Sequence, residues 1–541
     1  MLPIDRGLRR AVLALFALMP LVFGGIAVFL GQDSNWDLRN YHWYDAYAAL
    51  AGRLDQDMGA AQTPTYYNPT LDVPFYLLAN ALPARVFAFV LGAVQGCNFI
   101  LLYVLAWFTL RAVDERWRAA GAVAVALTGI FGGGHMALVG AIFYDNIVSL
   151  FVFAAMAVIL ANMTLLRAGP FGAALLRTAF AGFLVGCGVG LKLPTQIFAI
   201  GVCFGLLFVP GPFVRRFFLS FACGLGVIGG FLVFGGWWMW ELITHFGNPL
   251  FPYFNDIIRS NWALPESYRD DRFLPKNIVA ALTLPFRLFV DGTIAGEVGF
   301  RDARVLGAYI VLIATPPMLL IARIKKFGRS EPFAEVFAAR YLAAAAGLSY
   351  AVWLLLFCIY RYLIPLEMLA PLLVVACMAF WPLTRQRRLS LAIGLLGVMV
   401  LTMQPGNWGR MPWSASGRFV EVTPPALADP ANTLVIMTGF APTAFVIPSF
   451  PRAVSFLRPQ SYLVDPAHAT RFNEVLRARI AAHTGEILLL RAAYEKGAAE
   501  RVLPVYGLGI AAGSCRPLPT NLDGELEMCG VERIPQTEPV N

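Results

Sequence analysis

Residues 1–32 read MLPIDRGLRRAVLALFALMPLVFGGIAVFLGQ: basic residues lead into an apolar stretch of about 20 residues, which is long enough to span a bilayer. A cleaved signal peptide usually has a shorter apolar region and a small-residue cleavage motif, and this segment has neither. We therefore expect a retained signal anchor. Of the 541 residues, 58% are hydrophobic and only 14% are charged, which disfavours a soluble globular class and indicates a polytopic membrane protein.

The net charge of +9 would suit a nucleic-acid binder, but the basic residues form no continuous tract and sit between apolar segments. They report membrane topology instead, and we expect no nucleic-acid partner. Hydropathy predicts about eleven transmembrane helices, near residues 11–31, 84–110, 119–139, 146–166, 174–191, 194–212, 217–240, 304–322, 337–359, 363–382 and 389–404.

The connections between these spans alternate in charge. Basic residues lie before the first span and after the second, fourth, sixth, eighth and tenth, so all fall on one side of the membrane. The positive-inside rule then places the N-terminus in the cytoplasm and the C-terminus outside. One span more or fewer would destroy the alternation. The division at KLP (192–194) depends on Lys192 and Pro194, which would break a continuous helix.

Two external loops, residues 32–83 and 241–303, interrupt the membrane module of residues 1–404. In the tail, residues 405–541, we expect short buried strands in NTLVIMTG and GEILLLRAAY, an amphipathic helix between them in ATRFNEVLRARIAAHTG, and a last strand in ELEMCGVERI. We predict a mainly α, polytopic helical membrane protein with a small external α/β domain of accessory role. Six cysteines lie in apolar spans, whereas Cys515 and Cys529 lie in the tail, where an oxidising periplasm would permit a disulfide.

Ionisable residues gather at the expected outer ends of the spans. Exposing such charges to lipid costs a few kcal/mol each, so they usually face the bundle interior or a watery cavity. Together they predict a polar pocket at the external membrane boundary, formed by Asp33, Asp37, Asp145, Lys192, Glu241, His245 and Arg361.

Each of these residues also has a structural interpretation. Lys192 and Arg361 would reach the headgroups as snorkelling cations, and Asp145 would cap the helix of the fourth span. The first-loop carboxylates Asp33, Asp37 and Asp45 would form a solvated face, and His245 would be a structural histidine. None of these interpretations explains why two cations and at least three carboxylates converge on one face.

Such a pocket suits a phosphate at headgroup depth, because Lys supplies a point charge and Arg a bidentate fork. A nearby carboxylate accepts the proton of an attacking hydroxyl as a general base. The first loop, GQDSNWDLRNYHWYDAYAALAGRLDQD (31–57), adds aromatic rings that stack on sugar faces and favour the membrane interface. The helical spacing of Tyr41 and Tyr44 equally indicates an interfacial helix packed on the bundle.

Six motifs lie between residues 31 and 367: DSNWDLRNYHWYDAYAALAGR (33–53), TYYNPTLDVPFY (65–76), FYDN (143–146), GLKLPT (190–195), FGNPLFPYFN (246–255) and RYLIPLE (361–367). Their order and their shared side of the membrane resemble those of GT-C glycosyltransferases, polytopic enzymes that take sugars from polyprenyl-phosphate donors on the outer face. The resemblance adds little in the tail. The two prolines of FGNPLFPYFN are equally compatible with a rigid turn.

The resemblance implies an inverting transfer with Asp37 as catalytic base, Asp33 as the competing candidate, and Asp145 supporting the base or positioning the acceptor. It implies that Lys192 and Arg361 hold the donor phosphate. If the stretch is helical, Asp33 and Asp37 share a face and could tune each other or bind a divalent cation, but no complete ligand set is present and we expect no metal or other cofactor. Substrate contacts are assigned to Tyr41, His42, Tyr67, Asn68 and His245.

The expected partners are a polyprenyl-phosphate sugar, membrane lipids and a lipid, glycan or protein acceptor, in a bacterial inner membrane. A transporter or flippase would use the same cations but would place polar groups near mid-membrane, often in broken helices of matched halves. A polysaccharide polymerase or ligase usually relies on a large external loop between late spans. A noncatalytic scaffold leaves the carboxylates of the first loop without a role.

Overall fold

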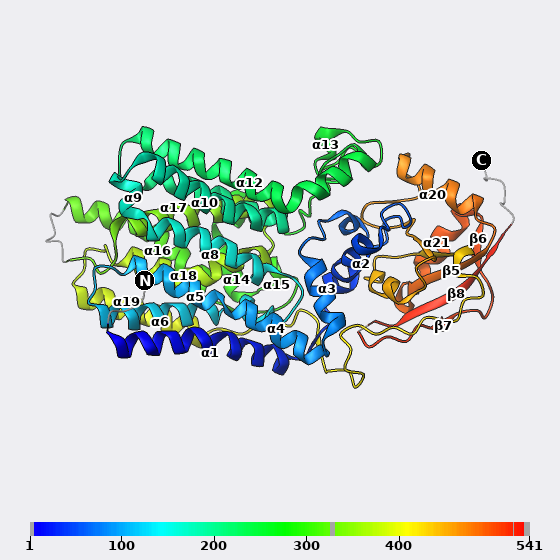
Figure 1. Cartoon of the computed structure of the whole chain (residues 1–541), viewed down its shortest axis with the longest axis horizontal. Helices are drawn as coiled ribbons and strands as arrows, with labels where there is room; N and C mark the ends of the chain where they lie inside the picture. The colour runs from blue at the N-terminus through cyan, green and yellow to red at the C-terminus, as the bar shows by residue number, and fades with distance from the viewer. Residues whose placement is uncertain (1–4, 325–330, 523, 535–541) are drawn as a thin grey trace. The chain divides into compact units, whose positions relative to one another are not determined.

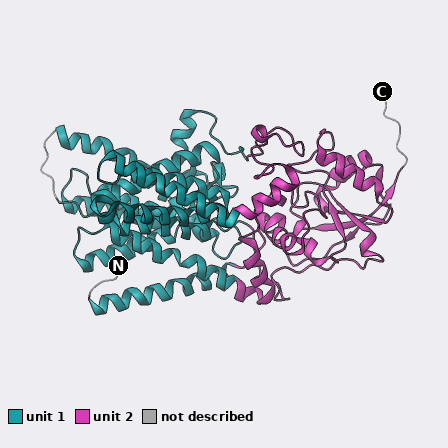
Figure 2. Ribbon diagram, turned by 45° about the horizontal axis from the view of Figure 1, so that its top comes forward, with its two compact units in different colours: residues 1–30, 88–235, 270–408 teal, residues 31–87, 236–269, 409–541 magenta. Residues whose placement is uncertain are grey.

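The computed structural model describes residues 5–324, 331–522 and 524–534. Two compact units make up the chain (Figure 2). Unit 1 contains residues 1–30, 88–235 and 270–408, and unit 2 contains residues 31–87, 236–269 and 409–541. The segment 31–87, most of it expected as an external loop, therefore folds together with the C-terminal tail.

Unit 1 is a bundle of helices (Figure 1). A helix coincides with each of the eleven expected spans, and α10 ends at Leu191, where the break at KLP was predicted. The helices are α1 (Arg6–Leu30), α4 (Ala84–Gly96), α5 (Asn98–Thr109), α6 (Glu115–Ile130), α8 (Asp145–Ala161), α10 (Phe171–Leu191), α11 (Gln196–Gly205), α12 (Phe213–Phe246), α16 (Arg304–Ile324), α17 (Val336–Leu356), α18 (Ile364–Met378) and α19 (Arg385–Leu401); α4 and α12 continue into unit 2.

Seven helical segments within the described residues are long and apolar enough to cross a membrane, which identifies a polytopic membrane protein. They are Arg6–Leu30, Ala84–Thr109, Phe171–Leu191, Phe213–Phe246, Arg304–Ile324, Val336–Leu356 and Tyr360–Met378. Shorter apolar helices include α8 and also α14 (Ile278–Val290), which lies inside the expected loop 241–303 and which the sequence reasoning missed.

Helix α18 forms the centre of unit 1. It packs against α5, α6, α8, α16 and α17, and every residue of it is buried. A helix that is apolar on all sides suits such a position. Close packing elsewhere depends on glycine: a Cβ added at Gly182 of α10 would lie 1.9 Å from the carbonyl oxygen of Cys223 in α12, so these backbones touch as in small-residue membrane seams.

The basic connections share one end of the unit 1 bundle, as predicted, as far as the described residues show; most of the connection RIKKFGR (323–329) lies outside them. Arginine side chains there donate to carbonyls near helix ends: Arg118 to Trp107, Arg215 to Leu166 and Arg388 to Glu331. The amide of Glu335 donates to the carbonyl of Thr109, which joins two of these connections. The charge alternation therefore identified one physical end of the bundle, while the side of the membrane it faces stays a prediction.

Unit 2 contains the expected α/β fold. Its sheet has the order β4-β3-β5-β8-β6, with β4, β3 and β5 parallel and β8 antiparallel to its neighbours. The predicted strands and helix are confirmed as β3 (Thr433–Met437), β5 (Glu486–Ala492), β8 (Leu526–Arg533) and α20 (Arg471–Ala482), and the Cys515–Cys529 disulfide is present. Sequence reasoning missed β4 (Ser455–Leu457), β6 (Leu508–Ile510), β7 (Arg516–Pro517) and α21 (Lys496–Val502).

The first-loop segment enters unit 2 through β1 (Gln32–Asp33), which pairs with β2 (Arg410–Met411). It continues through a π-helical turn, η1 (Leu38–His42), then α2 (Trp43–Ala51), the 3-10 turn η2 (Thr63–Tyr66) and α3 (Asp72–Ala81). Remaining short helices are α7 (Gly133–Ala137), α9 (Met163–Ala168), α13 (Asn255–Ile258) and α15 (Thr293–Gly296).

A buried ion pair fastens the first-loop segment to the sheet of unit 2. Arg53 Nε lies 2.6 Å from Asp57 Oδ2, and both side chains are almost completely buried. The guanidinium also donates to the carbonyl of Val454, and Asp57 accepts from the amide of Phe456. Within unit 2, the first loop and the tail are therefore joined by charged hydrogen bonds that are buried away from water.

Removing one partner of this pair should strongly destabilise unit 2. Asp57→Ala leaves the Arg53 charge buried without its carboxylate, for which we expect a loss of about 3–5 kcal/mol in the free energy of unfolding. Thermal unfolding in detergent measures this loss as a lower melting temperature. The double variant Arg53→Met/Asp57→Leu, which removes both charges, should lose less; equal losses in the single and double variants would contradict the assignment.

Candidate functional site

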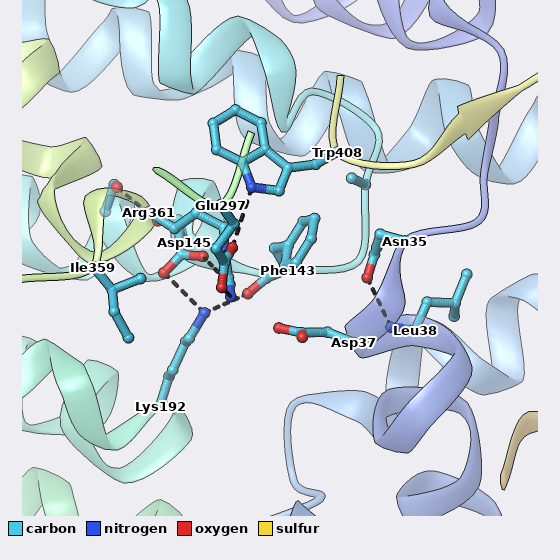
Figure 3. Close-up of polar contacts among 12 residues, drawn as sticks. Asn35, Asp37, Leu38, Phe143, Asp145, Lys192, Glu297, Ile359, Arg361 and Trp408 are labelled. Carbon is cyan, nitrogen blue, oxygen red and sulfur yellow. Dashed lines mark hydrogen bonds and ion pairs between the residues drawn. The ribbon is translucent and has the colours of Figure 1, made fainter. Parts of the chain in front are cut away.

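Two cations and two carboxylates meet in unit 1 (Figure 3). They lie where α8 and α18 begin and α10 ends, whereas the basic connections join the opposite ends of these helices. Lys192 Nζ lies 2.8 Å from Asp145 Oδ1, and Arg361 lies 3.8 Å from Asp145 Oδ2. Arg361 also contacts Glu297 through Nε at 2.9 Å. Three predicted site residues, Asp145, Lys192 and Arg361, are thus brought together. Glu297 was missed, because it lies 64 residues from Arg361 and no sequence spacing pairs them.

The backbone presents each of these groups at a helix end. Asp145 is the first residue of α8, and it follows Tyr144, which adopts a left-handed conformation with φ 64°. This conformation is costly for a residue with a bulky side chain and occurs at functional sites more often than elsewhere. Lys192 follows the last residue of α10 in extended backbone, and Arg361 lies in the 3-10 turn η5 (Tyr360–Leu363) before α18.

The contacts decide between the structural interpretations of these residues. Lys192 and Arg361 have side chains only 12% and 6% exposed, so neither is a snorkelling cation. Asp145 makes no capping hydrogen bond for α8, since Tyr144 occupies the cap position. Its carboxylate instead bridges the two cations, and Lys192 further donates to the carbonyl of Phe143 at 2.6 Å.

The cluster is electrically balanced and held from several sides. The guanidinium of Arg361 stacks over the ring of Phe143, with its Cζ 4.3 Å from the ring centroid. Trp408 Nε1 donates to Glu297 Oε2 at 3.3 Å. Asp145 and Glu297 therefore fix the positions of both cations, and an incoming anion would meet two pre-positioned positive groups.

A second buried network stabilises the same end of unit 1. Glu367 accepts from the amides of Gly134 and His135, each at 3.0 Å, and from the hydroxyl of Tyr360 at 2.5 Å. Asp302 pairs with Arg304 at 2.6 Å. None of these residues was predicted as a site residue, although Glu367 ends the motif RYLIPLE. They hold the first turn of α7 and the turn that carries Arg361, and so position the cluster.

In unit 2, Asp33 and Asp37 have different surroundings; Figure 3 shows Asp37 with Asn35 and Leu38 of its turn. The carboxylate of Asp33 is buried and accepts from the side-chain amide of Asn35 at 2.8 Å. Asn35 in turn accepts from the amide of Leu38 at 2.8 Å, and so holds the turn that carries Asp37. Asp37 accepts from the hydroxyl of Tyr41 at 3.1 Å. Asp33 lies in β1, so the stretch from Asp33 to Asp37 is not one helix and the condition under which the two aspartates would share a helical face is not met.

Next to this turn lies a buried pair of which one member, His42, was predicted as a site residue and the other, Asp72, was not. His42, an expected substrate contact, has Nδ1 2.6 Å from Asp72 Oδ1 at the start of α3. Asp45 of α2 is also buried, and neither of its carboxylate oxygens has a hydrogen-bond partner among the described residues. Burial, together with the charge of Asp72, raises the pKa of Asp45 well above its usual value. The solvated loop face considered for Asp45 is therefore wrong.

The raised pKa of Asp45 predicts a pH-dependent stability. A carboxyl whose pKa is raised in the folded state stabilises the protein below its unfolded pKa, and this contribution is lost as the pH rises through the folded pKa. Asp45→Asn should therefore gain melting temperature relative to the wild type as the pH rises from about 4 to about 8. Thermal unfolding across this range measures the difference; a difference that does not change with pH would contradict the prediction.

The remaining expected substrate contacts also lie in unit 2. The hydroxyls of Tyr67 and Tyr253 are hydrogen-bonded, and Asn68 accepts from the amide of Thr70 at 3.0 Å. Tyr41 packs edge-on against Tyr67, with ring centroids 5.3 Å apart. His245 is partly exposed and lies 3.3 Å from Asp55 and 3.8 Å from Glu241. Tyr41, His42 and Tyr67 thus form one aromatic group, whereas His245 belongs to a surface ion cluster.

Comparisons with known proteins give one structural similarity. No protein-family model matches the chain, and no curated protein matches it. Among solved structures, it is similar to the crystal structure of ArnT from Cupriavidus metallidurans bound to undecaprenyl phosphate. The identity is 14% and the TM-score 0.39, over 96% of this chain and 98% of that chain.

Proposed function

We propose that the protein is a membrane glycosyltransferase that moves a sugar from a polyprenyl-phosphate donor to a hydroxyl acceptor on the external face of a bacterial inner membrane. The observation that carries this proposal is the cluster in unit 1, where Lys192 and Arg361 are fixed around one carboxylate, Asp145, at a helix end. In a membrane protein, buried cations whose positions are fixed by acidic partners suit the binding of a phosphate at headgroup depth.

In the proposed reaction, Lys192 and Arg361 bind the phosphate that links lipid and sugar. The acceptor oxygen attacks the anomeric carbon, the bond from that carbon to the phosphate oxygen breaks, and the polyprenyl phosphate leaves with one more negative charge. Both cations stabilise this developing charge. The attack comes from the face opposite the leaving group, so the configuration of the sugar inverts.

Asp37 is the proposed general base, which takes the proton of the acceptor hydroxyl. The two aspartates differ in what their contacts do: Asp33 accepts from the side-chain amide of Asn35, which holds the turn, whereas Asp37 lies in that turn and is oriented by the hydroxyl of Tyr41. Asp33 then acts as a positioning residue through Asn35. Asp145 orders the two cations and supports donor binding in their neighbourhood.

We propose that no metal ion takes part, since the two side-chain cations supply the positive charge that the leaving phosphate requires. Transfer measured in the presence of EDTA should proceed at the rate measured without it. A rate that collapses in EDTA and recovers with added Mg²⁺ or Mn²⁺ would overturn this part of the proposal.

The proposal is tested on the purified chain in liposomes that contain a radiolabelled polyprenyl-phosphate sugar and a bacterial lipid extract. Label is followed in two ways, into a new product and across the bilayer. A labelled product with release of polyprenyl phosphate is the expected result. Label that crosses the bilayer without transfer would identify a flippase and overturn the proposal.

A further inference from the structure

Three segments of unit 2 converge beyond the carboxyl ends of neighbouring parallel strands. Residues 438–443 follow β3, residues 458–462 follow β4, and residues 493–495 follow β5; the strands are adjacent in the order β4-β3-β5. In open α/β sheets, ligands bind outside this edge, because the loops after parallel strands diverge there and leave backbone groups accessible.

Aromatic rings are exposed at this edge. The side chains of Phe440 and Tyr462 are 38% and 60% exposed, with ring centroids 4.9 Å apart and planes inclined by 47°. Tyr494 is 69% exposed on the neighbouring segment. These exposed aromatic residues come from separate loops and together present an apolar surface to solvent. Such a surface suits a ligand with apolar faces.

The loop that carries Phe440 is held in place by hydrogen bonds from two neighbouring segments. Arg458 is completely buried and donates to the carbonyls of Gly439, at 2.9 Å, and Ala441, at 3.4 Å. From the other side, Glu495 accepts from the amides of Phe440 and Ala441 at 3.2 and 3.0 Å. Burial lowers the pKa of Arg458 to about 10, so it stays charged at neutral pH. A pre-organised loop costs little ordering entropy on binding.

Polar groups border the rings. Gln62 donates to the carbonyl of Phe440 at 2.9 Å and to Asn40 Oδ1 at 3.2 Å. Its Oε1 and the hydroxyl of Thr438 are buried and have no hydrogen-bond partner among the described residues. Gln62 thus connects this edge to the turn of Asn40, three residues after Asp37. Gln460 and Glu495, which contact the Phe440 loop, are only half-buried. Inclined rings beside such amide and carboxylate groups suit a ligand with apolar C–H faces and hydroxyl edges.

We infer that Phe440 and Tyr462 form a saccharide-binding shelf at the carboxyl edge of the sheet, and that the acceptor of the transferase carries a glycan that stacks on it. Sugar rings present C–H groups to the aromatic faces and hydroxyls to half-buried polar neighbours on the same loops, such as Gln460 and Glu495. The inference names the acceptor class and so rests on the proposed function, but the binding step itself requires neither the donor nor Asp37.

Binding is tested with the full chain in fluorescent nanodiscs on an array of hexose- and pentose-terminated oligosaccharides. The wild type should bind at least one glycan class, and Phe440→Ala and Tyr462→Ala should each weaken that binding by tenfold or more. Tyr462→Phe, which keeps the ring, should retain most of it. The matched control is Phe254→Ala, which removes a ring of similar exposure, 43%, elsewhere in unit 2 and should bind as the wild type does.

Other outcomes would overturn the inference. These are a wild type that binds no glycan on the array, glycan binding that Phe440→Ala and Tyr462→Ala leave unchanged, or ring-dependent dimerisation in place of glycan binding. Asp37→Asn separates the two proposals, because it should bind glycan normally. If the wild type binds glycan through the rings but transfers no sugar, the proposed function is contradicted and the shelf is not. If the wild type transfers sugar but binds no glycan, the shelf is contradicted and the proposed function is not.

Discussion

Asp37→Asn should lower the rate of sugar transfer by about 10²- to 10⁴-fold, the range that a general base contributes. The amide keeps the size of the carboxylate and can accept the hydrogen bond from Tyr41, so the turn should stay folded. It cannot take the proton of the acceptor hydroxyl. Initial rates with radiolabelled donor in liposomes measure the loss, and melting temperature reports the fold.

The matched control is Asp55→Asn, which changes an aspartate of the same segment whose side chain is 85% exposed. Its rate should equal that of the wild type. Asp33→Asn should disorder Asn35, which holds the turn of Asp37, and so should lower both the transfer rate and the melting temperature. Asp37→Asn should lower the transfer rate alone. Normal transfer by Asp37→Asn, together with a folded but inactive Asp33→Asn, would move the base to Asp33.

Lys192→Ala should weaken donor binding by about 10- to 100-fold, because a charge-assisted hydrogen bond to phosphate contributes about 1.5–3 kcal/mol. The same change leaves Asp145 with Arg361 as its one remaining cation among the contacts described above. Equilibrium binding of a polyprenyl-phosphate sugar to protein in nanodiscs measures the dissociation constant. High salt should weaken binding by the wild type less than an exposed site would predict, since the cations are buried.

Two further variants separate charge from geometry. Lys276→Ala removes an exposed lysine of unit 1 and should leave the donor affinity unchanged. Arg361→Lys keeps the charge but loses the fork that contacts Glu297 through two nitrogens, so it should bind donor less tightly than the wild type. Unchanged affinity in both Lys192→Ala and Arg361→Lys would place the phosphate elsewhere.

The sequence by itself determined where the helices and the main strands lie. Apolar runs long enough to cross a bilayer have few alternatives to helix, so each expected span coincides with one. Continuous apolar runs between turn residues likewise predicted β3 and β5, and ELEMCGVERI was expected as the last strand, β8. The alternation of basic connections also identified one end of the bundle, because a chain that crosses back and forth returns to the same side every second span.

Only the tertiary structure decided which charged groups meet and which segments share a unit. Lys192 and Asp145 are 47 residues apart, and Glu297 reaches Arg361 over 64, so no local pattern encodes either pair. The left-handed Tyr144 and the hydrogen bonds that join the first loop to the tail have no sequence signature either. Helix and strand depend on local periodicity, whereas ion-pair partners depend on how finished elements pack, and packing is fixed only by the whole chain.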